Sequence, residues 1–143
     1  VVVEIGVGYG GLAVMNEIVS KACTLLVDLP VVVDVARNVI RRLGHAAALA
    51  ENHEGRPVCV VSNYAFSELN RELQDEYMEK YLVGSAHGMI LSNAGVFAGA
   101  IGGRSDEELV ACLRARGIAA EIHAQDEVLG PSDYLAGVKL IAW

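Results

Sequence analysis

The residues best suited to chemistry stand at the start of the chain, where an aliphatic strand with one acid runs into a glycine-rich stretch. The first five residues are three valines, Glu4 and Ile5. Glycine fills four of the next six positions, namely Gly6, Gly8, Gly10 and Gly11. β-Branched residues favour strands, and glycines allow a turn that approaches another molecule closely. Because residues 12–21 are compatible with a helix, the stretch predicts a strand, turn and helix that present backbone N–H groups to a nucleotide.

A second acid, Asp28, ends the next apolar run and stands 18 residues after Gly10 (28 − 10). An acid at about this distance suits hydrogen bonding to ribose hydroxyls. The first, second and fourth glycines also fit the dinucleotide spacing G-x-G-x-x-G, so a nicotinamide or flavin cofactor remains a candidate. Glu4 favours another ligand, because an acid at the end of an aliphatic strand is costly to bury without a donor or a cation. The competing interpretation of Glu4 is a solvent-exposed strand end.

Length and composition predict a single domain, residues 1–143, of the α/β class. The chain is 53% hydrophobic and 20% charged, which favours strands buried on both faces of a parallel sheet. No apolar run approaches the ~18 residues of a membrane span, and the basic residues do not interleave with aromatic ones, so neither a membrane nor nucleic acid is expected as a partner.

Three well-separated cysteines indicate reduced thiols in a cytoplasmic protein. The chain begins inside a strand without Met, which predicts a fragment that lacks an N-terminal region.

Hydrophobic periodicity and turn residues divide the chain into strands and helices. Strands are expected at residues 1–5, 24–27, 45–50, 58–61, 87–93, 118–124 and 138–143. Helices are expected at residues 12–21, at 30–43 with Pro30 in the first turn, at about 70–83 with Leu73 on the inward face, and at 105–116 with a capping box from Ser105 to Glu108. Residues 94–104 contain four glycines and are expected to form a loop. The pattern predicts a doubly wound, Rossmann-like, seven-stranded sheet that ends in two strands without a helix between them.

Several stretches resemble class I S-adenosylmethionine-dependent methyltransferases. Read as E-x-G-x-G-x-G, the residues from Glu4 to Gly10 resemble the first motif of that family, and the terminal strand pair resembles the end of its mostly parallel sheet, where the last strand is antiparallel. One branch of the family, the sugar O-methyltransferases, is similar in Val27–Pro30, Ser62–Leu69 and Leu140–Trp143. The resemblance implies transfer of a methyl group from S-adenosylmethionine to a hydroxyl of a small molecule, such as a sugar.

The resemblance also implies which residues bind the cofactor. In the family, the acid of the first motif lies beside the methionine portion of S-adenosylmethionine, and the acid after the second strand binds the ribose. On this basis the expected cofactor-binding residues are Glu4, Gly6, Gly8, Gly10, Asp28, Leu29, Asn63 and Tyr64.

The acceptor side of the reaction is expected beyond the carboxyl ends of the strands, where open α/β sheets bind their ligands. Asn63 and Tyr64 stand there, with Glu68 just after them and Asn93 at the end of the next strand. Glu68 is our candidate for the general base, and we expect its side chain to be partly buried. The alternative is that Glu68 only stabilises the start of a helix, where an acid is favourable. The loop at residues 94–104 and the missing N-terminal region are expected to form the acceptor pocket. No His, Asp and Glu set has metal-ligand spacing, so no metal is expected.

Two other functions compete with a methyltransferase. One is a NAD(P)-dependent oxidoreductase, which the glycine spacing also allows. The other is a non-catalytic domain that binds the cofactor or a partner protein. The sequence identifies neither the methyl acceptor nor the oligomeric state, and a homo-oligomer is left open.

Overall fold

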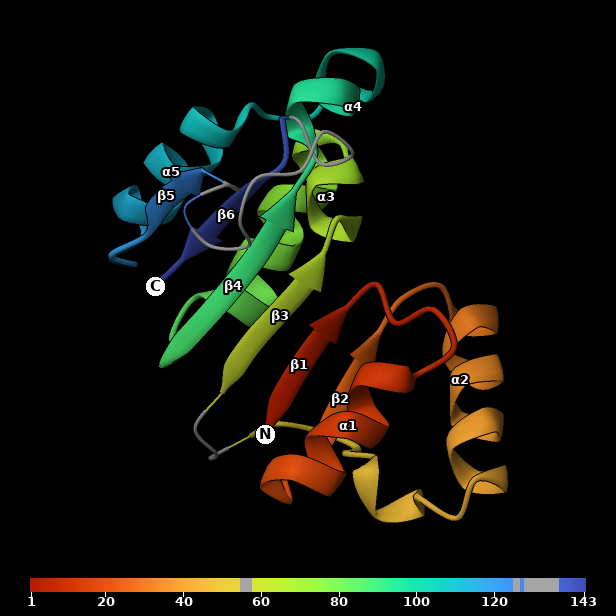
Figure 1. Cartoon of the computed structure of the whole chain (residues 1–143). Helices are drawn as coiled ribbons and strands as arrows, with labels where there is room; N and C mark the ends of the chain where they lie inside the picture. The colour runs from red at the N-terminus through yellow and green to blue at the C-terminus, as the bar shows by residue number, and fades with distance from the viewer. Residues whose placement is uncertain (55–57, 125–126, 128–136) are drawn as a thin grey trace. The chain divides into compact units, whose positions relative to one another are not determined.

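The computed structural model describes residues 1–54, 58–124, 127 and 137–143, which form a mixed α/β fold (Figure 1). The strands are β1 (Val2–Ile5), β2 (Thr24–Val27), β3 (Cys59–Asn63), β4 (His87–Ser92), β5 (Glu121–Ala124) and β6 (Lys139–Ala142). The α-helices are α1 (Gly11–Ser20), α2 (Pro30–Arg42), α3 (Arg71–Tyr77), α4 (Ala94–Ile101) and α5 (Asp106–Ala115). Three short helical segments are η1 (Ala46–Ala48), η2 (Ala65–Glu68) and η3 (Met78–Leu82).

The strands follow one another in the order β2-β1-β3-β4-β6-β5. β1 and β2 are parallel, with Val3 opposite Leu25, whereas β6 runs antiparallel to both β4 and β5. The predicted class is therefore confirmed: an α/β sheet, mostly parallel, that ends with an antiparallel strand pair. The turn expected around Gly130 lies outside the described residues.

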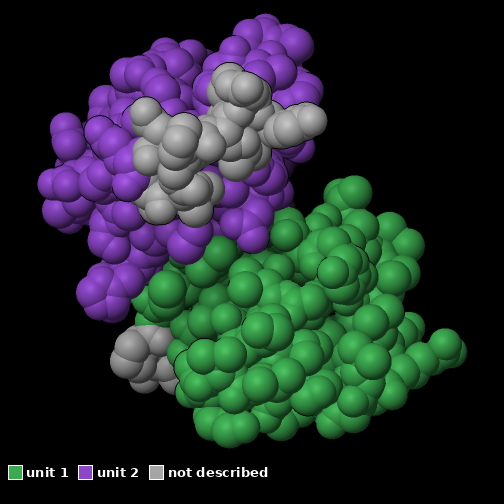
Figure 2. Space-filling model, in the orientation of Figure 1, with its two compact units in different colours: residues 1–61 green, residues 62–143 purple. Residues whose placement is uncertain are grey.

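The chain forms two compact units, shown in different colours in Figure 2. Unit 1 is Val1–Val61 and contains β1, α1, β2, α2 and η1, whereas unit 2 is Ser62–Trp143 and contains η2 and all later elements. The boundary falls within β3. No described helix has the length and apolar character that crossing a membrane requires.

Unit 1 has a small apolar core between its strands and its two helices. The buried members of this core are Val7, Ala13, Leu26, Ala36, Ile40 and Ala48. α2 begins with proline at its first turn and carries Arg41 and Arg42 in its last turn, where cations complement the helix dipole. These local signals explain why the position of α2 could be predicted.

The strand expected at residues 45–50 is wrong, because residues 46–48 form the 3₁₀ helix η1. Three consecutive alanines have little β propensity, and the chain turns there instead of extending. A remnant of the expected strand survives at Leu49, which forms an isolated parallel bridge with Thr24, and the Ala50 N–H donates to the Thr24 carbonyl at 2.9 Å. The described sheet therefore has six strands, and a single bridge stands where the seventh was expected.

The helix that follows β3 faces its core differently from the prediction. Asn70 caps α3 by accepting a hydrogen bond from the Leu73 N–H at 3.0 Å. Leu73, expected to face inward, is exposed, whereas Gln74 is fully buried. The Gln74 amide explains this placement, because it donates to the Phe66 carbonyl and accepts from the Arg104 N–H. Amphipathic periodicity misses such a residue, since a buried amide counts as polar in any hydropathy pattern.

The loop expected at residues 94–104 is also wrong, because residues 94–101 form α4 and the helix ends at Gly102 with φ of 67°. Gly95 and Gly99 lie inside the helix without positive φ angles. Glycine lowers helix propensity, but packing overrides propensity in a folded protein, and α4 packs against η2. The capping box that was predicted for the next helix, α5, is confirmed in both of its hydrogen bonds.

The last residue of the chain closes one end of unit 2. Trp143 pairs with Gly88 through two backbone hydrogen bonds of 3.1 Å, and its indole N–H donates to the Ser85 hydroxyl at 2.9 Å. The indole ring lies over Gly88 so closely that a Cβ atom there would overlap it. Glycine at position 88 is therefore what allows the ring to lie flat on the strand.

Candidate functional site

One backbone hydrogen bond joins the glycine-rich turn after β1 to the end of β2, and a second lies within the turn itself. The Gly6 N–H donates to the Val27 carbonyl at 2.9 Å, and the Gly10 N–H donates to the Val7 carbonyl at 2.8 Å. The turn needs glycine at position 10, where φ is 87° and a Cβ atom would lie 2.7 Å from Ile40 Cδ1. The turn can therefore approach α2 closely, and it leads directly into the N-terminus of α1.

Asp28 is built into the same turn. One carboxylate oxygen accepts a hydrogen bond from the Val7 N–H at 2.9 Å, and the other accepts from the Leu29 N–H at 2.7 Å. These two donors fix the orientation of the carboxylate. Each carboxylate oxygen can accept about two hydrogen bonds, so both oxygens keep capacity for ribose hydroxyls. Leu29, the next predicted cofactor residue, is 68% exposed.

Glu4 is the most unusual group in unit 1. Its side chain is buried, and among the described residues its Oε2 atom has no hydrogen-bond partner. Burial, together with the nearby negative charge of Asp28, raises the pKa of Glu4 from 4.5 to about 7. The strand-end alternative, a solvent-exposed Glu4, is therefore wrong. A buried carboxyl oxygen without a donor is costly, which indicates a position suited to an ammonium or sulfonium cation.

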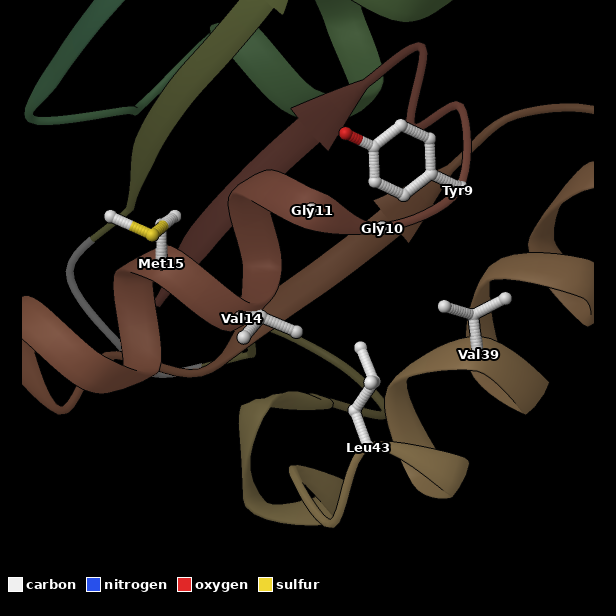
Figure 3. A pocket seen from close by; sticks show the side chains of 7 residues that line it. All are labelled: Tyr9, Gly10, Gly11, Val14, Met15, Val39 and Leu43. Carbon is white, nitrogen blue, oxygen red and sulfur yellow. The ribbon is translucent and has the colours of Figure 1, made fainter.

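A hollow of about 310 Å³ opens between the start of α1 and α2 (Figure 3). It is lined by Tyr9, Gly10, Gly11, Val14, Met15, Val39 and Leu43. Its walls are apolar, and neither Glu4 nor Asp28 belongs to them. Leu43, the C-cap of α2, lines the hollow and is 62% exposed.

In unit 2, the predicted residues gather at the end of β3. Asn63 is the last residue of the strand and is exposed, and Tyr64 follows with φ of 69°. The left-handed region costs a non-glycine residue roughly 1–2 kcal/mol. The Tyr64 N–H donates to the Leu91 carbonyl at 2.8 Å, and its own carbonyl accepts from the N–H groups of Ser67 and Glu68. These bonds hold Tyr64 in a strained conformation, as is common at functional sites.

Glu68 lies in η2 and not at the start of α3, whose N-cap is Asn70. Its side chain is exposed, so the partial burial expected for it is absent. Its Oε1 atom accepts a hydrogen bond from the Asn93 side-chain amide at 2.6 Å. The sequence placed Asn93 at the correct strand end but missed Ser67, whose hydroxyl lies 2.7 Å from Asn93 Oδ1. A serine shortly before a helix usually indicates a helix cap, so its residue type gives no sign of this contact.

Metal binding finds no support in the described part of the chain. Among those residues, no group of three or more His, Cys, Asp and Glu side chains is arranged to hold a metal ion. The cysteines Cys23, Cys59 and Cys112 form no disulfide bond with one another.

Comparison with solved structures identifies the fold. An O-methyltransferase family protein from Burkholderia thailandensis matches 99% of the chain with a TM-score of 0.70 at 14% identity, and the match covers 49% of that protein. Phosphoethanolamine N-methyltransferase 2 from Haemonchus contortus, solved in complex with S-adenosyl-L-methionine, matches 99% of the chain with a TM-score of 0.67 at 14% identity, over 47% of its length. The chain has a methyltransferase fold. It spans about half the length of these two structures. No family model and no curated protein matches the sequence.

The predicted residues divide between the two units. Unit 1 contributes the acid, the three glycines, Asp28 and Leu29 that were expected to bind a cofactor. Unit 2 contributes Asn63 and Tyr64 together with the Glu68–Asn93 pair. The structure thus brings together the residues of each group within its own unit.

Proposed function

We propose that this chain is an S-adenosylmethionine-dependent methyltransferase that acts on a hydroxyl group of a small molecule, such as a sugar. The observation that carries the proposal is the buried Glu4 carboxyl, whose Oε2 lacks a hydrogen-bond partner among the described residues and whose pKa is raised to about 7. A ligand with positive charge relieves the cost of this buried acid. S-Adenosylmethionine has both an ammonium and a sulfonium group.

The rest of unit 1 fits the nucleoside part of the same cofactor. Asp28 is oriented by two backbone donors and keeps acceptor capacity for ribose hydroxyls. The exposed Leu29 offers an apolar surface to the adenine. The turn at Gly6, Gly8 and Gly10 lets the backbone approach the ligand without side chains in the way. The sulfonium of the bound cofactor activates the methyl group for transfer.

Unit 2 supplies the groups for the acceptor. Open α/β sheets bind ligands beyond the carboxyl ends of their strands, and β3 ends at Asn63. We assign Glu68 as the general base that takes the proton from the acceptor hydroxyl. Asn63 and Tyr64 position the reactants and do not remove the proton. The choice of a sugar rests on the resemblance of Ser62–Leu69 to sugar O-methyltransferases.

A cytoplasmic location is part of the proposal. It is supported by Cys23, Cys59 and Cys112, which form no disulfide bond with one another, because cysteines stay reduced in that compartment. Self-association is tested by sedimentation of the chain with and without the cofactor.

Isothermal titration with S-adenosylmethionine, S-adenosylhomocysteine and NAD tests the cofactor. Binding of the two adenosyl ligands without binding of NAD is the expected result. Binding of NAD alone would identify an oxidoreductase. If none of the three ligands binds, a non-catalytic domain that binds a partner protein remains as the interpretation.

Transfer of a labelled methyl group to a panel of monosaccharides tests the reaction. The control is Glu76→Gln, which changes an exposed glutamate of α3. We expect label in at least one sugar with the wild type and the control, and a loss of about 10²-fold or more with Glu68→Gln at unchanged cofactor affinity. A small loss of rate with a lowered melting temperature would make Glu68 a structural residue only.

A further inference from the structure

Asn93 occupies the N-cap of α4, but its side chain does not cap the helix. Asparagine is among the best N-cap residues because its side-chain oxygen accepts a hydrogen bond from the first turn and stabilises the helix. Here the Asn93 Nδ2 donates to Glu68 Oε1 at 2.6 Å instead. The first turn of α4 relies on the Ser92 hydroxyl, which accepts from the Ala94 N–H, and on the Asn93 carbonyl, which accepts from the Val96 N–H.

A buried serine fixes which end of the Asn93 amide points to Glu68. The Ser67 hydroxyl is fully buried, lies 2.7 Å from Asn93 Oδ1 and accepts from the Asn93 N–H at 3.2 Å. The same hydroxyl lies 2.6 Å from the carbonyl of the strained Tyr64. The Glu68 carboxylate can only accept, so the donating Nδ2 end of the amide faces it. The Oδ1 end then lies on Ser67, whose single hydroxyl proton is shared between Oδ1 and the Tyr64 carbonyl.

The backbone beneath Asn93 is anchored independently. The neighbouring Ser92 hydroxyl donates to the buried Asp106 carboxylate, and Lys139 Nζ lies 3.6 Å from the other oxygen of Asp106. Ser92 and Asp106 are both buried, so this pairing is shielded from water. These contacts hold the end of β4 next to Asn93.

We propose that Asn93 is a positioning residue that holds the Glu68 carboxylate in the orientation required to accept a proton, with Ser67 fixing the Asn93 amide. This inference rests on the proposed function, because it assigns Asn93 a role through Glu68. An exposed glutamate otherwise samples many rotamers, and ordering such a side chain costs conformational entropy. The Asn93 amide pre-orders the carboxylate and thereby lowers that cost for the reaction.

The first experiment measures the network without any ligand. In ¹H–¹⁵N spectra, the Asn93 side-chain amide, assigned by its loss in Asn93→Ala, is expected to shift in Ser67→Ala and in Glu68→Gln. The control Asn70→Ala removes an asparagine that only caps α3 and should leave the signal in place. An Asn93 amide signal that stays unchanged in Glu68→Gln overturns the proposal, whatever the chain methylates.

The second experiment measures the role by a double-mutant cycle on the sugar that receives the most label. Asn93→Ala is expected to lower kcat about tenfold or more with unchanged affinity for S-adenosylhomocysteine, because a hydrogen bond to a charged group is lost. In the Glu68→Gln background, Asn93→Ala should have little further effect. Asn93→Asp keeps the size and the acceptor but loses the donor, so it should not restore the rate.

Four outcomes contradict the positioning role. Equal losses from Asn93→Ala in both backgrounds, or full rescue by Asn93→Asp, would show that Asn93 does not act through Glu68. A loss matched by Asn70→Ala at equal loss of stability would reduce Asn93 to a structural residue. If the wild type binds S-adenosylhomocysteine but transfers no label to any acceptor, the proposed function fails and this role fails with it, whereas a spectral failure alone leaves the function standing.

Discussion

Glu4 destabilises the free protein in a way that depends on pH. The ordinary pKa of a glutamate is 4.5, whereas the pKa of Glu4 in the folded chain is about 7, so the folded state binds the proton more tightly. The protonated form is therefore favoured in the fold, and the contribution of Glu4 to stability is greatest below pH 4.5, falls between pH 4.5 and 7, and stays low above pH 7. The difference between the two values corresponds to about 3.5 kcal/mol at most, at roughly 1.4 kcal/mol per pH unit, and the partial exposure of the group to solvent reduces it.

We therefore expect Glu4→Gln to stabilise the free chain at pH 8 and to weaken binding of S-adenosylmethionine. The neutral amide removes the buried charge, so the melting temperature should rise by several degrees at about pH 8 and change little at about pH 5. Melting curves at both pH values measure the first effect, and isothermal titration measures the second. Glu76→Gln, the same change at an exposed site, serves as the control. An equal gain in stability at both pH values would contradict the burial argument.

Asp28→Ala is expected to weaken binding of S-adenosylhomocysteine about tenfold or more, since a hydrogen bond to a charged group contributes on the order of 1.5–3 kcal/mol. The substitution also removes the acceptors of the Val7 and Leu29 N–H groups. Asp28→Asn keeps one of these acceptors, so it separates the effect on the turn from the effect on the ribose. Titration of both variants, with melting curves to confirm folding, gives the answer. Unchanged affinity in a folded Asp28→Ala chain would remove Asp28 from the site.

The residues of unit 1 could be located from the sequence because their signals are local. Glu4, the glycines and Asp28 lie within one strand, turn and strand, and few functions other than nucleotide binding require these residue types at that spacing. The pairing of Ser67 with Asn93 could not be predicted, since 26 residues separate the two and a serine before a helix usually indicates a cap. The burial predicted for Glu68 was wrong for the same reason, because exposure depends on neighbours that are distant in sequence.

At the scale of the element, the glycines of the turn between β1 and α1 differ in the space that a substituted alanine would have. At Gly10, φ is 87° and a Cβ atom would lie 2.7 Å from Ile40 Cδ1, whereas at Gly8 φ is 50° and nothing lies within 4 Å of a Cβ atom. Both positions disfavour alanine through the backbone, but only one adds a collision.

We expect Gly10→Ala to lower the free energy of unfolding clearly more than Gly8→Ala, whose cost should stay near the roughly 1–2 kcal/mol of a left-handed residue. Urea titration of both variants measures the difference. Adding Ile40→Val removes the colliding Cδ1 atom and should recover part of the loss in Gly10→Ala. Equal costs at the two glycines would show that α2 moves away freely.

The elements that could be predicted carry their own end signals. Pro30 opens α2, and the Ser105–Glu108 box opens α5, so these helices need no distant partner to be recognised. α4 has only the asparagine at its N-cap as a start signal, and its glycines indicate a loop instead. Its helical form depends on packing against η2, which no local pattern contains.

At the scale of the whole molecule, a ligand that binds only the folded chain raises its stability by mass action. At a concentration of 100 times the dissociation constant, S-adenosylhomocysteine should add about 2.7 kcal/mol to the free energy of unfolding. Calorimetric scans with S-adenosylhomocysteine and with NAD measure this effect. Amide hydrogen exchange should show protection in unit 1, around Gly6–Gly10 and Leu29. Equal stabilisation by NAD would favour a dinucleotide instead.

Trp143 gives the two units separate spectroscopic signatures. It is the only tryptophan of the chain, and it lies in unit 2 over Gly88 with its indole N–H on Ser85. Its fluorescence therefore reports the integrity of unit 2, while the circular dichroism signal of the whole chain also includes α1 and α2 of unit 1. Denaturation curves that coincide by the two methods would mean that both units unfold as one cooperative body, and curves that separate would give each unit a free energy of its own.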